Sequence, residues 1–136
     1  MSAIQFIGPY RFFQALARAM SSGGSIIQIS SVTATIMIED HVAYMGTKAG
    51  MDHIIRTIAC EFGGQGIRAN SIAPGGIADT PMSGGGLNLP ALQRLYQREI
   101  PIGRPGVAKD VADTAVWLAS DEAAFVTGQV IHVSGG

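Results

Sequence analysis

The sequence predicts an α/β protein whose core is a parallel β-sheet with flanking helices. Two observations indicate this fold class. Short runs rich in β-branched residues alternate with longer segments in which apolar residues recur at helical spacing, and such alternation is typical of βαβ units with right-handed crossovers. The chain has 136 residues, of which 47% are hydrophobic and 14% are charged, so we expect residues 1–136 to form a single globular domain.

The first half of the chain predicts the order helix, strand, helix. Apolar residues at helical spacing predict a helix from about 8 to 20, and the SSGG that follows is a stop signal. The segment SIIQISS, residues 25–31, has the nearly continuous apolar character of a buried parallel strand. After an irregular segment over 32–41, helical spacing over 42–62 ends at GGQG and predicts the longest helix.

The second half predicts two more strands and two more helices. In order, these are a strand over 67–76 that stops at Pro74, a glycine-rich loop over 75–88, a short helix around LPALQRLYQREI, a helix over about 108–119 and a strand in the closing GQVIHVSGG. Pro74 ends its strand because proline cannot donate a hydrogen bond to a central ladder. Cys60 and Trp117 lie in apolar helical contexts, so we expect both to pack in the core.

The charge distribution excludes several function classes. Nine basic residues balance ten acidic ones, and no cluster of lysine or arginine occurs, so we expect no nucleic-acid partner and no anionic membrane surface. No apolar run approaches the roughly 18 residues of a membrane span, and the N-terminus does not resemble a signal peptide. The three histidines lack metal-ligand spacing, so no metal is expected. A cytoplasmic location is the expectation.

Three side chains that could take part in catalysis lie at and after the end of the first predicted strand. Ser31 ends that strand, and Tyr44 and Lys48 lie four residues apart, on one face of the long helix. Ligands of such sheets gather beyond the carboxyl ends of the strands. A nearby cation favours the phenolate form of a tyrosine, and a serine hydroxyl can stabilise charge on a substrate oxygen. The alternative for the tyrosine and lysine is a surface pair without a chemical role.

Four segments in order and spacing resemble the C-terminal half of a short-chain dehydrogenase/reductase. They are GSIIQISSVTA, AYMGTKAG with Tyr44 thirteen residues after Ser31, IRANSIAPGG, and GRPGVAKDVADTAVWLASDEAAFVTGQVIHVSGG. Together they cover nearly the whole chain. The resemblance implies a Rossmann-like parallel sheet that lacks the N-terminal half of the doubly wound fold. It also implies an NAD(P)-dependent oxidoreductase that interconverts a secondary alcohol and a ketone by hydride transfer.

The resemblance also assigns catalytic roles. It implies that Tyr44 is the general acid/base, that Lys48 assists it and hydrogen-bonds the nicotinamide ribose, and that Ser31 orients the substrate oxygen. Ser30 is expected to point to the other side of the strand. Where the family has a catalytic asparagine in the preceding helix, this chain has Gln5, so the fourth member of the catalytic set stays open.

The resemblance places cofactor contacts after the second strand. There, Pro74, Gly75 and Ile77 match the family's pattern, and the family's threonine follows. The spacing in PGGIADTPM is one residue longer than usual, so Asp79 or Thr80 can correspond to that threonine. The TPM that follows favours Thr80.

The family's glycine-rich phosphate-binding turn does not occur in the sequence, and neither does the residue that selects between NAD and NADP. The only dense glycines are Gly84 to Gly86. We therefore expect a chain that supplies three strands and leaves SIIQISS with an unpaired edge, so that the enzyme is truncated or incompletely represented, or its edge is covered by another copy. The alternative function is a non-catalytic remnant or assembly module that cannot hold the dinucleotide. The resemblance further implies a homo-oligomer, dimer or tetramer, that acts on a small alcohol or ketone.

Overall fold

A computed structural model of the protein describes residues 3–21, 23–83 and 90–136. The predictions for residues 84–88 therefore lie outside the described residues. The helices and strands are α1 (Gly8–Ala19), β1 (Gly24–Ile29), α2 (Val42–Phe62), β2 (Ile67–Pro74), α3 (Pro90–Glu99), α4 (Ala108–Ala119) and β3 (Val130–Val133). The order and type of all seven elements agree with the sequence prediction.

The three strands form one parallel sheet in the order β1-β2-β3. In the register, Gln28 of β1 lies opposite Ser71 of β2, and Ile72 of β2 lies opposite Ile131 of β3. Within the described residues, β1 has β2 as its single neighbour. The predicted parallel sheet is therefore confirmed.

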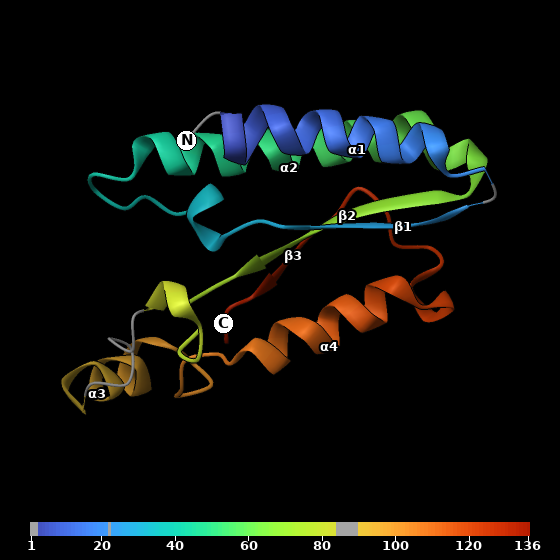
Figure 1. The fold of residues 1–136 in the computed structure, drawn as a ribbon. Coiled ribbons are helices and arrows are strands. Elements are labelled where there is room, and N and C mark those ends of the chain that lie inside the picture. The colour runs from blue at the N-terminus through green and yellow to red at the C-terminus, as the bar shows by residue number, and fades with distance from the viewer. Residues whose placement is uncertain (1–2, 22, 84–89) are drawn as a thin grey trace.

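Helices cover both faces of the sheet (Figure 1). Helices α1 and α2 lie side by side on one face, and α4 lies along the other. The first core, between the sheet and α1 and α2, contains Ile26, Ile55, Ile58 and Ile67. The second core, beneath α4, is smaller and centres on Ile72 and Leu118. Because side chains alternate along a strand, each strand contributes to both cores.

Glycine ends the long helix for a steric reason. After α2, a 3₁₀ turn over Gly63–Gln65 leads to Gly66 at φ +75°, a left-handed conformation that glycine adopts without a Cβ clash. The Gly66 carbonyl then accepts from the amide of Gly24 at 3.2 Å. The turns that start β1 and β2 are joined here, which sets the register of the two strands.

Several details differ from the expectations. β1 ends at Ile29, so Ser30 and Ser31 lie beyond the strand, and a π-helical segment at Ala3–Ile7 precedes α1. Cys60 is exposed and Trp117 is 36% exposed, so the prediction that both pack in the core is wrong. Each lies one residue from the buried stripe of its helix, and one residue turns a side chain by about 100°.

No helix in the described part of the chain is long and apolar enough to span a membrane.

The start of α4 is stabilised by an aspartate. The Asp110 carboxylate accepts from the amide of Val107 at 2.8 Å and from both terminal nitrogens of Arg104, at 2.8 and 3.0 Å. The hydrogen bonds from Arg104, and to a smaller extent the one from Val107, lower the pKa of Asp110 to about 2. The carboxylate form is therefore the one that holds the N-terminus of α4.

Asp110→Asn is expected to remove a pH-dependent part of the stability. A carboxyl group whose pKa is depressed by folding stabilises the fold above its ordinary pKa, 3.8, and loses that contribution as the pH falls towards about 2. Urea unfolding of wild type and variant should therefore give a constant difference near neutral pH that shrinks between about pH 4 and 2. A difference that persists unchanged to pH 2 would contradict this role of the carboxylate. Asp113→Asn, which breaks the exposed pair with Lys109, controls for loss of charge on the same helix.

Candidate active site

The serine predicted to be catalytic lies just beyond the carboxyl end of β1. Ser31 is half-buried and caps a 3₁₀ turn at Val32–Ala34. Its Oγ accepts from the amide of Thr33 at 3.2 Å and from the Thr33 hydroxyl at 2.9 Å. Because both contacts use the oxygen as acceptor, the Ser31 hydroxyl hydrogen remains available for an acceptor such as a substrate oxygen. Helix α2 packs on this turn.

Tyr44 and Lys48 lie together in the first turns of α2. Both are half-buried, and the Lys48 ammonium lies 5.7 Å from the centroid of the Tyr44 ring. A cation at this distance from an aromatic ring is attracted to it. The helical spacing thus places the two side chains next to each other, as the sequence predicted.

The position of the lysine is fixed by the sheet. Lys48 Nζ donates to the carbonyl oxygen of Ile29, the last residue of β1, at 2.9 Å. The amide of Ser30 points the other way and donates to Ile72 of β2 at 2.6 Å, so the Ile29 carbonyl faces the unpaired edge of β1. The ammonium is therefore held at the carboxyl end of the sheet, two residues from Ser31.

Burial and a neighbouring charge shift the pKa of Lys48 in opposite directions. Burial lowers the pKa of Lys48 from its ordinary value, and the negative charge of Asp52, one helical turn further along α2, partly raises it. Asp52 was not singled out from the sequence, although its spacing of four residues from Lys48 was a usable signal.

Gln5, which stands where the family has its asparagine, contacts α2. The hydroxyl of Thr47 lies 3.2 Å from Oε1 of Gln5 and 2.7 Å from the carbonyl oxygen of Tyr44. Thr47 is the residue before Lys48, so Gln5 meets the segment that carries both predicted catalytic side chains. Gln5 and Lys48 also line one small cavity of about 240 Å³, together with the buried Gln28.

The residues predicted to contact a cofactor lie after β2. Pro74 ends that strand, and a Cβ on Gly75 would come within 3.0 Å of Ser134, so the close approach of β2 and β3 already requires glycine there. Ile77 pairs with Gly106 in an isolated parallel bridge. The structure brings these residues close to β3 and the start of α4.

Asp79 and Thr80, the two candidates for one position, have different surroundings. The Asp79 carboxylate accepts from the amide of Ala108 at 2.7 Å, so it is engaged at the first residue of α4. Thr80 is half-buried, and its hydroxyl makes only a long contact of 3.4 Å to the carbonyl oxygen of Ile77. The threonine hydroxyl is thus the less committed of the two groups.

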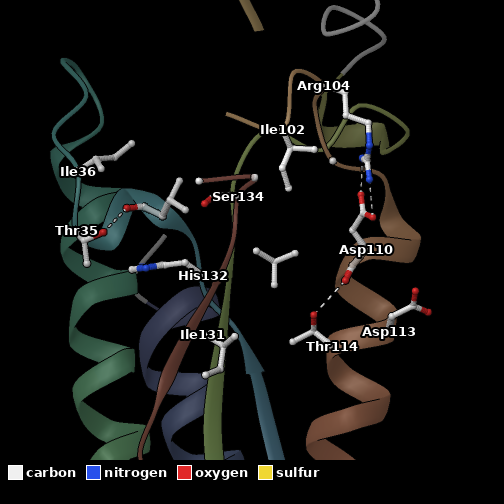
Figure 2. A pocket seen from close by; sticks show the side chains of 15 residues that line it. Thr35, Ile36, Ile102, Arg104, Asp110, Asp113, Thr114, Ile131, His132 and Ser134 are labelled. Carbon is white, nitrogen blue, oxygen red and sulfur yellow. Dashed lines mark hydrogen bonds and ion pairs between the residues drawn. The ribbon is translucent and has the colours of Figure 1, made fainter. Parts of the chain in front are cut away.

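A large cavity lies beside this candidate site. It has a volume of about 1000 Å³ and is lined by none of the three predicted catalytic residues. Its wall begins at Val32, the residue after Ser31, and continues across the end of β3 and the start of α4 (Figure 2). There, His132, Ser134 and Arg104 add polar groups to apolar walls. Because the cavity borders the turn that Ser31 caps, it is a candidate for part of a substrate space.

Taken together, the side chains can exchange a proton and orient an oxygen. A phenol beside an ammonium can act as a general acid or base, and a serine hydroxyl can donate to a developing oxyanion. No group of three or more histidine, cysteine, aspartate or glutamate side chains that could hold a metal occurs in the ranges that the structure describes.

Comparison with known proteins extends the sequence resemblance. All 136 residues match the family profile described as enoyl-(acyl carrier protein) reductase. The 3beta-hydroxysteroid dehydrogenase 1 of Eggerthella lenta is 41% identical over 113 residues, which are 83% of this chain and 43% of that relative.

Two solved structures have the same fold. A short-chain type dehydrogenase/reductase from Mycobacterium ulcerans matches with a TM-score of 0.81 and 41% identity over 88% of this chain and 44% of that one. A 7α-hydroxysteroid dehydrogenase in complex with NADH and 7-oxo glycochenodeoxycholic acid matches with a TM-score of 0.82 and 34% identity over 90% of this chain and 48% of that one. The chain spans about half the length of these relatives. From the family match, the identity and the fold, this chain belongs to the short-chain dehydrogenase/reductase family.

Proposed function

We propose that the chain is the catalytic half of an NAD(P)-dependent oxidoreductase that interconverts a secondary alcohol and a ketone. The observation that carries the proposal is the placement of Tyr44 and Lys48 at the carboxyl end of β1, with the ammonium 5.7 Å from the ring centroid and bonded to Ile29. Family membership supports oxidoreductase chemistry, since the relatives include hydroxysteroid dehydrogenases.

In the proposed reaction, each of the three side chains has one task. The Tyr44 phenolate takes the hydroxyl proton from the alcohol, and in the reverse direction the Tyr44 phenol returns that proton to the ketone oxygen. Lys48 supplies the positive charge that favours the phenolate. Ser31 donates a hydrogen bond to the same substrate oxygen, and its oxygen is held for this by the two contacts from Thr33.

The residues present fit one end of a dinucleotide. An ammonium has three hydrogens, of which Lys48 gives one to Ile29. The other two, together with the Tyr44 hydroxyl, are a suitable donor set for the vicinal hydroxyls of a ribose, and Pro74, Gly75, Ile77 and Thr80 are proposed to contact the nicotinamide end. When bound, NAD or NADP would supply the hydride acceptor or donor. No residue in the described ranges forms a glycine-rich turn between a strand and a helix, the usual cradle for the phosphates.

Titration with NADH and with NADPH, followed by nicotinamide fluorescence, tests the proposal. Saturable binding by the folded chain is the expected result, together with NAD(P)H formation when a secondary alcohol is added to the oxidised cofactor. Absence of binding in a sample that circular dichroism shows to be folded would instead support a non-catalytic module. Comparing the two nucleotides would also determine the cofactor preference.

A homo-oligomer and a cytoplasmic location remain parts of the proposal. Exposed apolar side chains elsewhere on the surface support association, since Val42 at the start of α2 is 83% exposed and Phe125 is fully exposed. Sedimentation velocity would measure the assembly state directly, and a monomer at micromolar concentration would contradict the oligomer.

A further inference from the structure

Helix α2 carries a buried carboxylate for which the proposed reaction has no assigned role. Asp52 is 4% exposed and lies within the helix stripe that packs on the sheet, between apolar neighbours such as Met51 and Ile55. Its Oδ1 is fully enclosed and has no hydrogen-bond partner among the described residues. A carboxylate in such a place is unfavourable unless a positive charge lies close by.

Of the two basic residues four positions from Asp52 on α2, Arg56 is exposed and Lys48 is half-buried, so Lys48 is the one that shares the less solvated environment of Asp52. Lys48 and Asp52 are four positions apart, so they lie one above the other on α2. They do not form a direct ion pair, because the ammonium is turned towards the Ile29 carbonyl at 2.9 Å. Asp52 therefore acts on the ammonium through space.

A second lysine and aspartate four residues apart provide a comparison within the chain. On α4, Lys109 contacts Asp113 directly at 2.6 Å, with side chains that are 76% and 64% exposed. Such exposed pairs contribute little, because water screens them. On α2, Lys48 is half-buried and Asp52 is 4% exposed, so water screens their charges less than it screens those of the pair on α4.

The described elements that pack against α2 contain no acidic residue that could act on this lysine as Asp52 does. The π-helical segment at Ala3–Ile7, the turn at Val32–Ala34 and strand β1 contain no charged residue. On β2, Arg68 reaches the α4 side of the sheet and donates to the carbonyls of Leu118 and Ser120. The charged residues of α1, Arg11 and Arg18, are exposed.

We propose that Asp52 is a positioning residue of the active site, whose buried negative charge keeps the ammonium of Lys48 charged beside the Tyr44 ring. The Ile29 carbonyl fixes where the ammonium lies, and the carboxylate offsets part of the decrease in the pKa of Lys48 that burial causes. This inference rests on the proposed function for its catalytic meaning. The electrostatic claim itself concerns the folded chain and can be measured without turnover.

The test measures the pKa of Lys48 by NMR. The sequence contains two lysines, Lys48 and Lys109, so lysine labelled with ¹³C at Cε gives two titrating signals, and Lys48→Met assigns them. Removing the carboxylate in Asp52→Asn should lower the pKa of Lys48 by about one unit or more, the usual effect of a close opposite charge. The matched control Asp113→Asn should leave the pKa of Lys48 unchanged.

A second variant guards against misfolding of the first. Asp52→Leu replaces the buried carboxylate by an apolar side chain of similar size, a change that folded proteins often accept, and it should lower the pKa of Lys48 in the same way. An unchanged pKa of Lys48 in a folded neutral variant would overturn the proposal and give Asp52 a structural role only.

Turnover gives a separate readout. With a neutral residue at position 52, Lys48 loses its proton at lower pH, so the alkaline limb of the kcat profile should move to lower pH while KM for the substrate is preserved. If the Asp52 variants lower the pKa of Lys48 but the wild-type protein shows no turnover, the proposed function is refuted and the electrostatic pairing is retained. A normal profile with an unshifted lysine would refute the pairing alone.

Discussion

Tyr44→Phe should lower kcat by about 10²–10⁴-fold, the range that a positioned acid/base group contributes. The substitution removes one oxygen and keeps the ring that lies 5.7 Å from the Lys48 ammonium. Because the ring still fills its place, the fold should be preserved, and because Lys48 keeps its two free hydrogens for the ribose, the affinity for the dinucleotide should fall much less than kcat. Steady-state kinetics of alcohol oxidation, together with nicotinamide fluorescence titration, separate the two effects.

Tyr10→Phe is the matched control for the loss of a phenol. Tyr10 lies on α1, is 40% exposed and makes only a long hydrogen bond of 3.4 Å with Gln14. Its substitution should leave turnover within a factor of about two, as expected for a surface change of less than about 0.5 kcal/mol. Equal activity of the Tyr44 variant and wild type would remove the proton-transfer role from Tyr44.

Leu118→Ala is expected to cause the largest loss of stability, about 2–5 kcal/mol. Leu118 is fully buried and is the residue through which α4 packs on Ile72 in the second core. Single domains are typically stable by only about 5–15 kcal/mol, so the variant would have little stability left. Urea unfolding followed by circular dichroism at 222 nm measures the difference.

Val116→Ala controls for the loss of apolar side-chain atoms on the same helix. Val116 is 70% exposed, so its truncation should change the free energy of unfolding by less than about 0.5 kcal/mol. A similar loss for both variants would indicate that α4 is stabilised by its exposed face, for example through association of chains, and not by the core beneath it.

Much of the fold could be predicted because local patterns agree with the tertiary arrangement. The β-branched run before Ser31 and the helical spacing from Val42 to Phe62 each specify an element on their own, and each element was found with the expected type. The pairing of Tyr44 with Lys48 followed from helix geometry alone, which fixes neighbours four residues apart. The resemblance then assigned chemistry that spacing alone could not.

Features that depend on contacts between elements were not predictable in the same way. The hydrogen bond from Lys48 to Ile29 joins residues nineteen positions apart, and no local pattern specifies it. The burial of Asp52 depends on how α2 lies on the sheet, and a charged residue normally indicates an exposed face. The predictions for Cys60 and Trp117 were wrong for the complementary reason. An apolar residue next to the buried face of a helix can still point to solvent, and its apolar character alone does not show which way it points.

The open edge of β1 has a consequence for any longer sheet that contains this chain. Along β1, the amide and carbonyl groups of Ser25, Ile27 and Ile29 face away from β2, because those of the alternate residues bond to it. An incoming strand would bring its amides to the same row of acceptors, where the Ile29 oxygen already holds the Lys48 ammonium. A carbonyl oxygen has two lone pairs, so one atom can serve both partners. The pairing of a further strand with β1 and the orientation of the Lys48 side chain would then be coupled through that single oxygen.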